Sequence, residues 1–255
     1  MGGDIKRQQQ FATAKDTRMN TAAAQTWTQQ WQAVRQRIAQ AAQAAGRAPD
    51  AVQLLAVSKT FAVDAVAAVH AAGQVAFGEN YIQEGVDKIA ALSPQRAQLQ
   101  WHCIGPVQSN KTRLVAEHFD WVHTVDRLKI AQRLNDQRPA HLPPLQVCVQ
   151  LNVDRAPTKS GATPDEATAL AQAIRAMPRL QLRGLMCMPD PVAGFAAQCA
   201  AFAPAKHVFD EWCAHGWGVD TLSMGMSGDL EAAIASGATL VRVGSAIFGS
   251  RHATA

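Results

Sequence analysis

The stretch Leu54-Leu55-Ala56-Val57-Ser58 is a short apolar run, and Lys59-Thr60 follow it directly. A run of this kind predicts a buried β-strand. The next stretch, Val63–Ala72, is amphipathic, and its spacing predicts an α-helix. The same order of strand and helix recurs along the rest of the chain, so this segment is the first unit of a repeating α/β architecture.

Eight strands are predicted in this way: Leu54–Ser58, Val75–Gly78, Leu99–Gly105, Trp121–Thr124, Leu145–Asn152, Leu180–Met186, Thr221–Ser223 and Leu240–Val243. The helical stretches between them include Val63–Ala72, Ile82–Leu92, Asn110–His118, Arg127–Asp136, Pro164–Met177, Phe195–His215 and Asp229–Ser236. Strands that alternate with helices predict a parallel sheet. A strand with its crossover helix takes about 30 residues, so eight units favour a single-domain (β/α)8 TIM barrel. An open doubly wound sheet is the alternative.

Two segments precede the first predicted strand. Trp27, Trp31, Val34 and Ile38 recur at helical spacing, which predicts an extra N-terminal helix packed on the barrel. Residues 1–20 are polar and lack the apolar segment of a signal peptide. We therefore expect residues 1–20 to form a disordered tail and residues 21–255 to form the barrel.

Composition excludes several classes of protein. The chain has 255 residues, of which 48% are hydrophobic and 17% charged, so it is not a disordered protein. The formal net charge is +4, but no basic stripe with interleaved aromatic residues indicates a nucleic-acid partner. No apolar stretch approaches the roughly 18 residues of a membrane span. The five cysteines are odd in number and form no C-x-x-C pair. We therefore expect neither a disulfide framework nor a zinc site, and a reducing cytoplasm fits this pattern best.

The chemically distinctive segments cluster directly after the predicted strands. They are Lys59, Gly78-Glu79-Asn80-Tyr81, Gly105-Pro106-Val107-Gln108-Ser109-Asn110-Lys111, Asn152-Val153-Asp154, Met186-Cys187-Met188-Pro189, Ser223-Met224-Gly225-Met226-Ser227-Gly228 and Gly244-Ser245. In a barrel, all of these segments face the carboxyl-terminal rim, where barrel enzymes bind their ligands.

The last two of these loops are candidates for phosphate binding. Ser227 precedes a predicted helix start at Asp229 and is suited to cap it. Gly244-Ser245 forms a second turn of small residues with available N–H groups. Barrels often bind phosphate with the loops after strands 7 and 8, and helix N-termini attract phosphate. Plain capping of the two loops explains the same residues equally well.

Lys59 and Arg242 are the charged residues that matter most. At the end of an apolar strand, Lys59 is partly desolvated, which lowers the pKa of the amine and frees it to attack a carbonyl. The alternative is a lysine that extends into solvent. Alternation places Leu240, Arg242 and Gly244 on one face of the last strand. If that face points inward, Arg242 is a charge inside the barrel that needs a partner; if outward, it meets a helix.

Of four further residues at strand ends, two have two possible roles and two have one. Asn80 and His102 are able to contact a ligand or to serve as hydrogen-bonded structural residues. We expect Cys103 and Cys187 to be packed thiols. Neither a Ser/His/Asp spacing nor an H-E-x-x-H motif is present, so the sequence predicts no triad and no metal site of that type.

Seven segments in this order resemble the YggS/PROSC family of pyridoxal phosphate homeostasis proteins. They are Leu54–Thr60, Phe77–Tyr81, Ile104–Lys111, Lys159–Gly161, Leu182–Met186, Leu222–Ser227 and Val241–Gly249. The resemblance covers about residues 25 to 251. Two departures are present: Ser245 stands where threonine is usual, and Gly228 stands where a bulkier residue is common.

The resemblance implies a fold like the N-terminal barrel of alanine racemase and a cofactor, pyridoxal 5′-phosphate (PLP). It implies that Lys59 holds PLP as a Schiff base, that Ser227, Gly244 and Ser245 hold the phosphate, that Arg242 approaches the pyridine nitrogen, and that Asn80 belongs to the same site. An arginine beside that nitrogen leaves the ring mostly unprotonated and a poorer electron sink. That favours holding or delivering the cofactor over strong carbanion chemistry.

Two functions compete on such a barrel: a protein that buffers PLP and delivers it to apoenzymes, and an amino-acid racemase-like enzyme. Alanine racemases need a second, β-rich domain that contributes a tyrosine base. This chain stops at Ala255, soon after the last predicted strand, and its one tyrosine is Tyr81. We therefore expect the first function, in a cytoplasmic monomer without a catalytic residue. A Schiff-base aldolase is a third reading, which a spectrum would separate because only bound PLP gives a yellow chromophore.

Overall fold

Eight parallel strands close into a barrel in the computed structural model, which describes residues 3–154, 156 and 159–249, with side chains from residue 22 onward. The strands are β1 Gln53–Val57, β2 Ala76–Glu79, β3 Gln100–Cys103, β4 Trp121–Val125, β5 Leu145–Leu151, β6 Leu180–Cys187, β7 Thr221–Ser223 and β8 Leu240–Val243. Each strand pairs in parallel with its neighbour in sequence, and β8 pairs with β1. The ring is therefore closed, which excludes the open doubly wound sheet.

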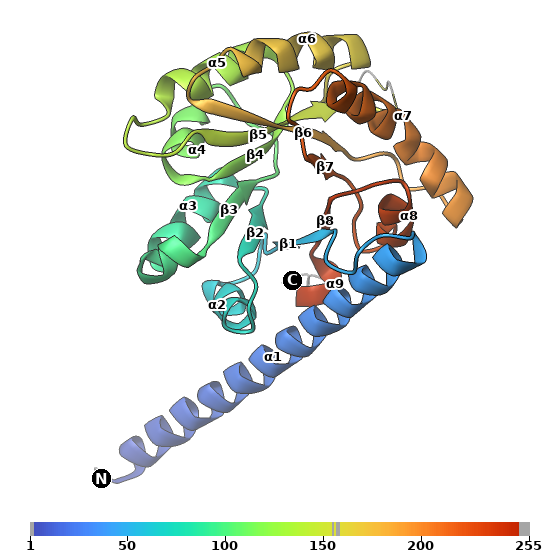
Figure 1. Cartoon of the computed structure of the whole chain (residues 1–255). Coiled ribbons are helices and arrows are strands. Elements are labelled where there is room, and N and C mark those ends of the chain that lie inside the picture. The colour runs from blue at the N-terminus through green and yellow to red at the C-terminus, as the bar shows by residue number, and fades with distance from the viewer. Residues whose placement is uncertain (1–2, 155, 157–158, 250–255) are drawn as a thin grey trace.

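Helices follow the strands and lie outside the barrel (Figure 1). They are α1 Gly3–Ala44, α2 Val63–Ala71, α3 Ile82–Ala91, α4 Thr112–His118, α5 Leu128–Gln137, α6 Pro164–Arg175, α7 Phe195–Ala214, α8 Leu230–Ala235 and α9 Ser245–Phe248, together with a 3-10 helix, η1 Ser93–Gln98. The sequence predicts neither η1 nor α9, because both are too short for a periodic apolar pattern. The predicted TIM barrel itself is confirmed.

The predicted and observed strand bounds differ by at most two residues at either end. The largest difference is in β3, which ends at Cys103, whereas the sequence predicts a strand to Gly105. Ile104 still donates to the Glu79 carbonyl, at 2.9 Å, but the backbone then passes against Asn80. A Cβ atom on Gly105 would lie 2.0 Å from the Asn80 carbonyl oxygen, so only glycine allows this close approach.

The predicted N-terminal helix is α1, and it packs on the barrel as expected. Trp31, Val34 and Ile38 are buried in the core, and the Trp31 indole donates to the Gln74 side chain at 2.8 Å. The backbone is helical from Gly3 to Ala44. The side chains of residues 1–21 lie outside the described part, so a tail independent of the barrel stays a prediction.

The apolar core is divided between two layers. The larger cluster fills the space between the strands and the surrounding helices. A small cluster of Trp121, Cys148 and Met186 stands apart from it, and its members come from β4, β5 and β6. Polar residues are also buried: His123 on β4 contacts Ser223 on β7, and these strands are not neighbours, so the contact crosses the barrel interior. The interior is therefore partly polar, unlike the branched apolar filling typical of this fold.

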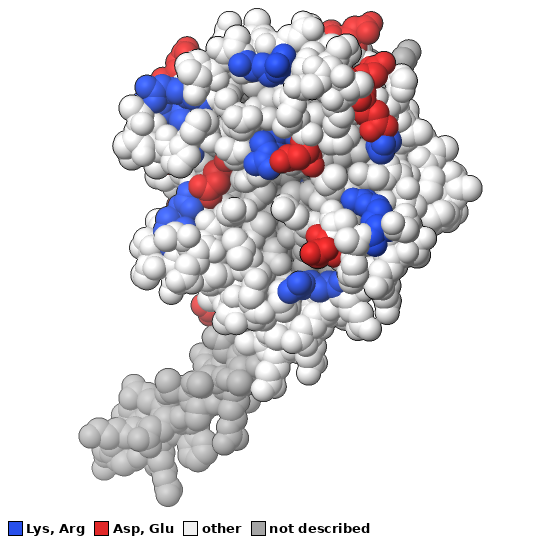
Figure 2. All heavy atoms as spheres, viewed as in Figure 1, with Lys and Arg blue, Asp and Glu red and all other residues white. Residues whose placement is uncertain are grey.

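Charged side chains are spread over the surface. On the face that Figure 2 shows, Lys and Arg lie in small groups, several of them beside Asp or Glu. Among the described helices, none has both the length and the apolar character required to cross a membrane. Within the same part of the chain, no three His, Cys, Asp or Glu side chains come together as metal ligands would.

Candidate functional site

A pocket of about 840 Å³ opens among the loops that follow the strands. It is lined by residues from most of the barrel: Val57, Lys59, Thr60, Phe61, Asn80, Ile104, Pro106, Thr124, Gln150, Lys159, Ser160, Met186, Met188, Pro189, Asp190, Pro191, Met226, Ser227, Gly228, Arg242, Gly244, Ser245 and Gly249. The set includes all six site residues predicted from sequence, Lys59, Asn80, Ser227, Arg242, Gly244 and Ser245. Segments up to about 190 residues apart therefore meet at one cavity, at the rim where barrels bind ligands.

A buried ion pair holds the backbone on the amino side of Lys59. The Ser58 hydroxyl donates to Glu79 Oε1 at 2.6 Å, and Lys88 Nζ donates to the same oxygen at 2.8 Å. Lys88 also donates to the Ser58 carbonyl at 2.7 Å. Burial raises the pKa of Glu79, and the Lys88 ammonium and the Ser58 hydroxyl oppose that rise. Ser58 is thus held at both its carbonyl and its hydroxyl.

The same network reaches the carboxyl side of Lys59. Lys88 Nζ donates to Glu84 Oε1 at 2.7 Å, and the Thr60 backbone N–H donates to that oxygen at 2.6 Å. Thr60 has a φ of 67°, in the left-handed region that a β-branched residue rarely adopts. Because both neighbours of Lys59 are fixed from α3, its side chain leaves the strand in a defined direction, toward the pocket.

The two predicted phosphate loops meet in the structure. The Ser245 hydroxyl donates to the Ser227 hydroxyl at 3.2 Å. Gly244 lies close to β1, since a Cβ atom there would be 3.0 Å from the Val57 carbonyl oxygen. A Cβ atom on Gly228, by contrast, would meet no heavy atom of the described chain within 4 Å. These loops form a small wall of hydroxyls and exposed backbone at one side of the pocket.

Arg242 points inward, and 5% of its surface is exposed. One guanidinium nitrogen donates to the Ser223 carbonyl at 2.7 Å and to its hydroxyl at 2.8 Å. The other terminal nitrogen donates to the Cys187 carbonyl at 2.9 Å. Burial lowers the pKa of Arg242, but its partners in these contacts are neutral oxygens rather than a carboxylate. The structure thus decides the orientation that the sequence leaves open.

Two histidines extend this contact through the barrel. Ser223 Oγ lies 2.9 Å from His123 Nδ1, and His123 Nε2 lies 2.9 Å from His102 Nδ1. Since Arg242 only donates, the Ser223 hydroxyl proton is available to His123. Burial lowers the pKa of His102 to about 3 and that of His123 well below its usual value, so both rings are neutral at pH 7.

Asn80 presents an unused acceptor at the pocket. Its Oδ1 atom is buried and has no hydrogen-bond partner among the described residues. A buried amide oxygen without a partner costs free energy, which a ligand donor would recover. The second reading of Asn80, as a hydrogen-bonded structural residue, does not fit this atom.

An ion-pair cluster borders the cavity on the side formed by the loops after β5 and β6. Lys159 Nζ contacts the carboxylates of Asp154 and Asp190, the latter at 2.6 Å. These residues follow β5 and β6, so the cluster joins two rim loops. Cys103 and Cys187, predicted to be packed thiols, are buried, and burial raises the pKa of each to about 12. Neither is a nucleophile at neutral pH.

Sequence reasoning missed the partners that fix Lys59 and Arg242. Lys88 lies within an amphipathic helix where lysine is ordinary, and His123 lies within an apolar strand. Only strand alternation could have placed His123 on the inner face. From the sequence, His102 is either a ligand contact or a hydrogen-bonded structural residue. It stacks on Trp121 with ring centroids 5.1 Å apart and is hydrogen-bonded to His123, which is the structural role.

Comparison with known proteins identifies the family. The family model of the alanine racemase N-terminal domain matches residues 30–252. A curated pyridoxal phosphate homeostasis protein of Pseudomonas aeruginosa is 59% identical over 215 residues, which cover 84% of this chain and 91% of that protein. This chain belongs to the family of pyridoxal phosphate homeostasis proteins. The resemblance found from its sequence motifs is confirmed.

Solved structures agree with the fold. PipY of Synechococcus elongatus, solved with PLP bound, is 37% identical, with a TM-score of 0.73 over 83% of this chain and all of that chain. Alanine racemase of Corynebacterium glutamicum is 17% identical, with a TM-score of 0.61 over 87% of this chain and 61% of that enzyme. The second likeness concerns the barrel fold alone.

Proposed function

We propose that this protein binds PLP in the rim pocket, holds it covalently on Lys59, and buffers or delivers it inside the cell. The observation that carries the proposal is the convergence of Lys59, Asn80, Ser227, Arg242, Gly244 and Ser245 on one cavity. Support also comes from PipY, a 37% identical relative whose structure was solved with PLP bound. Curated relatives of the present chain are named pyridoxal phosphate homeostasis proteins.

The residues present fit this cofactor. The hydroxyls of Ser227 and Ser245, with the narrow approach at Gly244, supply donors for a phosphate group. Asn80 Oδ1 awaits a donor. Arg242 lies on the inner wall of the pocket, with its guanidinium fixed by Ser223 and Cys187. Donors and acceptors therefore stand on different sides of the cavity, as an asymmetric anionic heterocycle requires.

The chain's own groups suit retention more than turnover. When bound, the cofactor supplies an aldehyde that condenses reversibly with amines and a ring that withdraws electrons. Lys59 supplies the amine, and an incoming amine of a substrate or acceptor is able to displace it. Arg242 donates hydrogen bonds while keeping its own proton, so it leaves a neighbouring ring nitrogen unprotonated and the electron sink weak.

The alternative is a racemase-like enzyme, which needs proton transfer on both faces of a carbanion. Tyr81 is 56% exposed and is not among the residues that line the pocket. The other lysine of the described lining, Lys159, is held by two carboxylates. These placements favour a binding protein without a dedicated substrate, which we propose acts in the cytoplasm as a monomer and passes PLP to apoenzymes.

A two-part assay tests the proposal. One part measures racemisation, transamination and decarboxylation of the common amino acids by the loaded protein. The other mixes the loaded protein with a PLP-dependent apoenzyme and follows recovery of its activity. We expect reactivation without turnover. Turnover at ordinary enzymatic rates of about 1 to 1000 per second would overturn the non-enzymatic function, and failure to reactivate any acceptor would overturn delivery.

A further inference from the structure

The N-terminal helix α1 contacts the proposed phosphate loop at Ser227 through a single arginine, Arg37. Arg37 Nη1 donates to the Ser227 carbonyl at 3.0 Å. The other two nitrogens of the same guanidinium donate to the Glu231 carboxylate, one of them at 2.6 Å. Three donors of one rigid fork therefore join α1, the loop at Ser227 and the first turn of α8.

A second arginine of the same N-terminal segment fixes the far end of α8. Arg47 Nη1 donates to the Ile234 carbonyl at 3.0 Å and to the Ala238 carbonyl at 2.7 Å. With α8 held at its carboxyl end by Arg47, Arg37 adds a bond from α1 to the loop before α8, which is also held from within by the Asp229 carboxylate accepting from the Met226 backbone. Ser227, whose hydroxyl accepts from Ser245, is in that loop.

Charge gives the Arg37 contact a second effect. Glu231 and the Ser227 carbonyl lie within hydrogen-bond reach of one guanidinium, so this carboxylate is near any anion held by Ser227. A carboxylate repels a phosphate, and that repulsion falls when a cation pairs with it. The hydrogen bond with Arg37 lowers the pKa of Glu231, and the pairing raises the pKa of Arg37. Both groups are therefore charged at neutral pH, and the pair has little net charge.

We propose that Arg37 is a positioning residue for the phosphate group of PLP, because it fixes the Ser227 backbone and neutralises Glu231. The inference rests on the proposed function, since it concerns the same pocket. Arg37 does not line the pocket and acts through Ser227 and Glu231. Its effect depends on the ligand's phosphate and not on the bond to Lys59.

The test compares two arginines of α1 and two ligands. Arg37→Ala removes the contact, and Arg35→Ala is the matched control, since the Arg35 guanidinium lies over the Trp31 ring, 5.1 Å from its centroid. Dissociation constants for PLP and for pyridoxal, which lacks the phosphate, are measured from the absorption of the adduct. Arg37→Ala should weaken PLP binding roughly tenfold, the size of a lost charge-assisted hydrogen bond. Pyridoxal binding and the absorption maximum should stay unchanged, and Arg35→Ala should change neither.

A rescue variant separates the charge effect from the backbone effect. Adding Glu231→Gln to Arg37→Ala removes the unpaired carboxylate, so part of the lost PLP affinity should return. No recovery would overturn the neutralisation of Glu231. Equal PLP affinities of Arg37→Ala and Arg35→Ala, or an equal loss for both ligands in Arg37→Ala, would overturn the positioning role alone. If the wild-type protein forms no adduct with either ligand, the proposed function itself falls, and Arg37 with it.

Discussion

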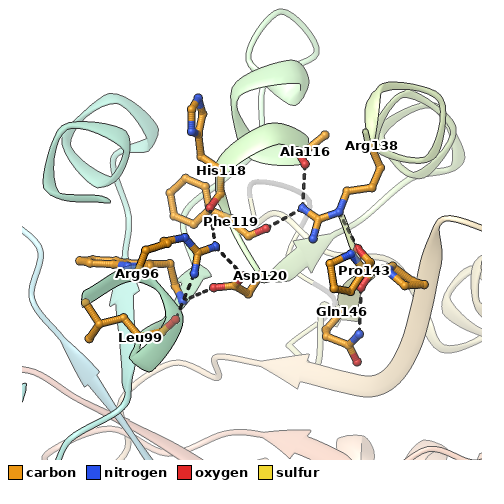
Figure 3. A network of polar contacts seen from close by, with 11 residues as sticks. Arg96, Leu99, Ala116, His118, Phe119, Asp120, Arg138, Pro143 and Gln146 are labelled. Carbon is orange, nitrogen blue, oxygen red and sulfur yellow. Dashed lines mark hydrogen bonds and ion pairs between the residues drawn. The ribbon is translucent and has the colours of Figure 1, made fainter. Parts of the chain in front are cut away.

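The two rims of the barrel differ in how their polar groups are used. At the amino-terminal rim, Arg138 donates to the carbonyls of Ala116, Phe119 and Pro143, at 2.7 to 2.8 Å, and ties three chain segments together (Figure 3). At the carboxyl-terminal rim, Asn80 Oδ1 is buried without a partner among the described residues. The Arg138 network at the first rim serves the fold, whereas the second rim combines such structural contacts with Asn80 Oδ1, an acceptor that stays open to a ligand.

The amino-terminal rim is also closed by charge pairs. Asp120 accepts from Arg96 at 2.6 Å and from the Trp101 backbone at 2.8 Å. Figure 3 shows Arg96 and Arg138 in the same network, with Arg96 directed at Asp120 and Arg138 at the Phe119 carbonyl. Arg183 pairs with Asp220 and lies over the Trp121 ring, 4.7 Å from its centroid. Residues at the amino-terminal rim thus bond mainly to one another, whereas residues at the carboxyl-terminal rim surround a cavity.

The largest effect on stability should come from the sealed rim. Arg138→Met would leave three carbonyl acceptors without their donor, so the free energy of unfolding should fall by about 3 kcal/mol. The control is Arg96→Met at the same rim. Arg96 donates to the Leu99 and His118 carbonyls as well as to Asp120, but its side chain is 36% exposed, so water replaces part of these bonds and the loss should be only about 1 kcal/mol. Urea titrations measure both. PLP affinity should be unchanged in each folded variant, and a loss in Arg138→Met would erase the contrast between the rims.

The interior histidines should make stability depend on pH. The pKa of His102 is about 3 in the folded protein, against an ordinary value of 6.5, and that of His123 is also strongly lowered. Above pH 6.5 both states are neutral and nothing is lost. Below it the unfolded state binds protons that the folded state does not, so stability falls by on the order of 1 kcal/mol per pH unit for each histidine.

Unfolding titrations between about pH 7 and pH 4.5 measure this slope. The double variant His102→Gln, His123→Gln should show a shallower fall than the wild type, whatever its stability at pH 7. Identical slopes would mean that the two rings take up protons inside the folded barrel, which would contradict the lowered pKa values of His102 and His123.

Within the open rim, the phosphate loops should dominate affinity. Charge-assisted hydrogen bonds to phosphate are about twice as strong as neutral ones. Ser227→Ala and Ser245→Ala should each weaken PLP binding about tenfold, and Asn80→Ala only about threefold. Equilibrium titration of absorption gives the three constants. If Asn80→Ala has the weakest binding of the three, the assignment of phosphate to the serines is wrong.

The smallest effect is expected at Gly228, where a Cβ atom meets open space and φ is not in the left-handed region. Gly228→Ala should stabilise the protein by about 0.5 kcal/mol, because it restricts the unfolded chain. Thermal unfolding measures this shift. PLP affinity should not change, and a clear loss would show that the loop needs the freedom of glycine to hold its ligand.

The sequence predicts the barrel because each strand is apolar and each following helix amphipathic, and the site because the resemblance places named residues at strand ends. It does not predict what fixes them. Lys88, His123 and Arg37 are ordinary residues in their own helices and strand, and their partners lie 30, 100 and 190 positions away. Such pairs depend on barrel closure and strand register, which no local pattern encodes.

The central claim is that Lys59 is the covalent attachment point in the open rim, and one labelling experiment tests it most directly. The protein is incubated with PLP, reduced with borohydride and digested, and the modified peptide is identified by mass spectrometry. The account predicts label on Lys59, and a Lys59→Ala protein without the visible absorption band. Label on Lys159, which borders the same pocket, or an undiminished band in Lys59→Ala, would contradict it.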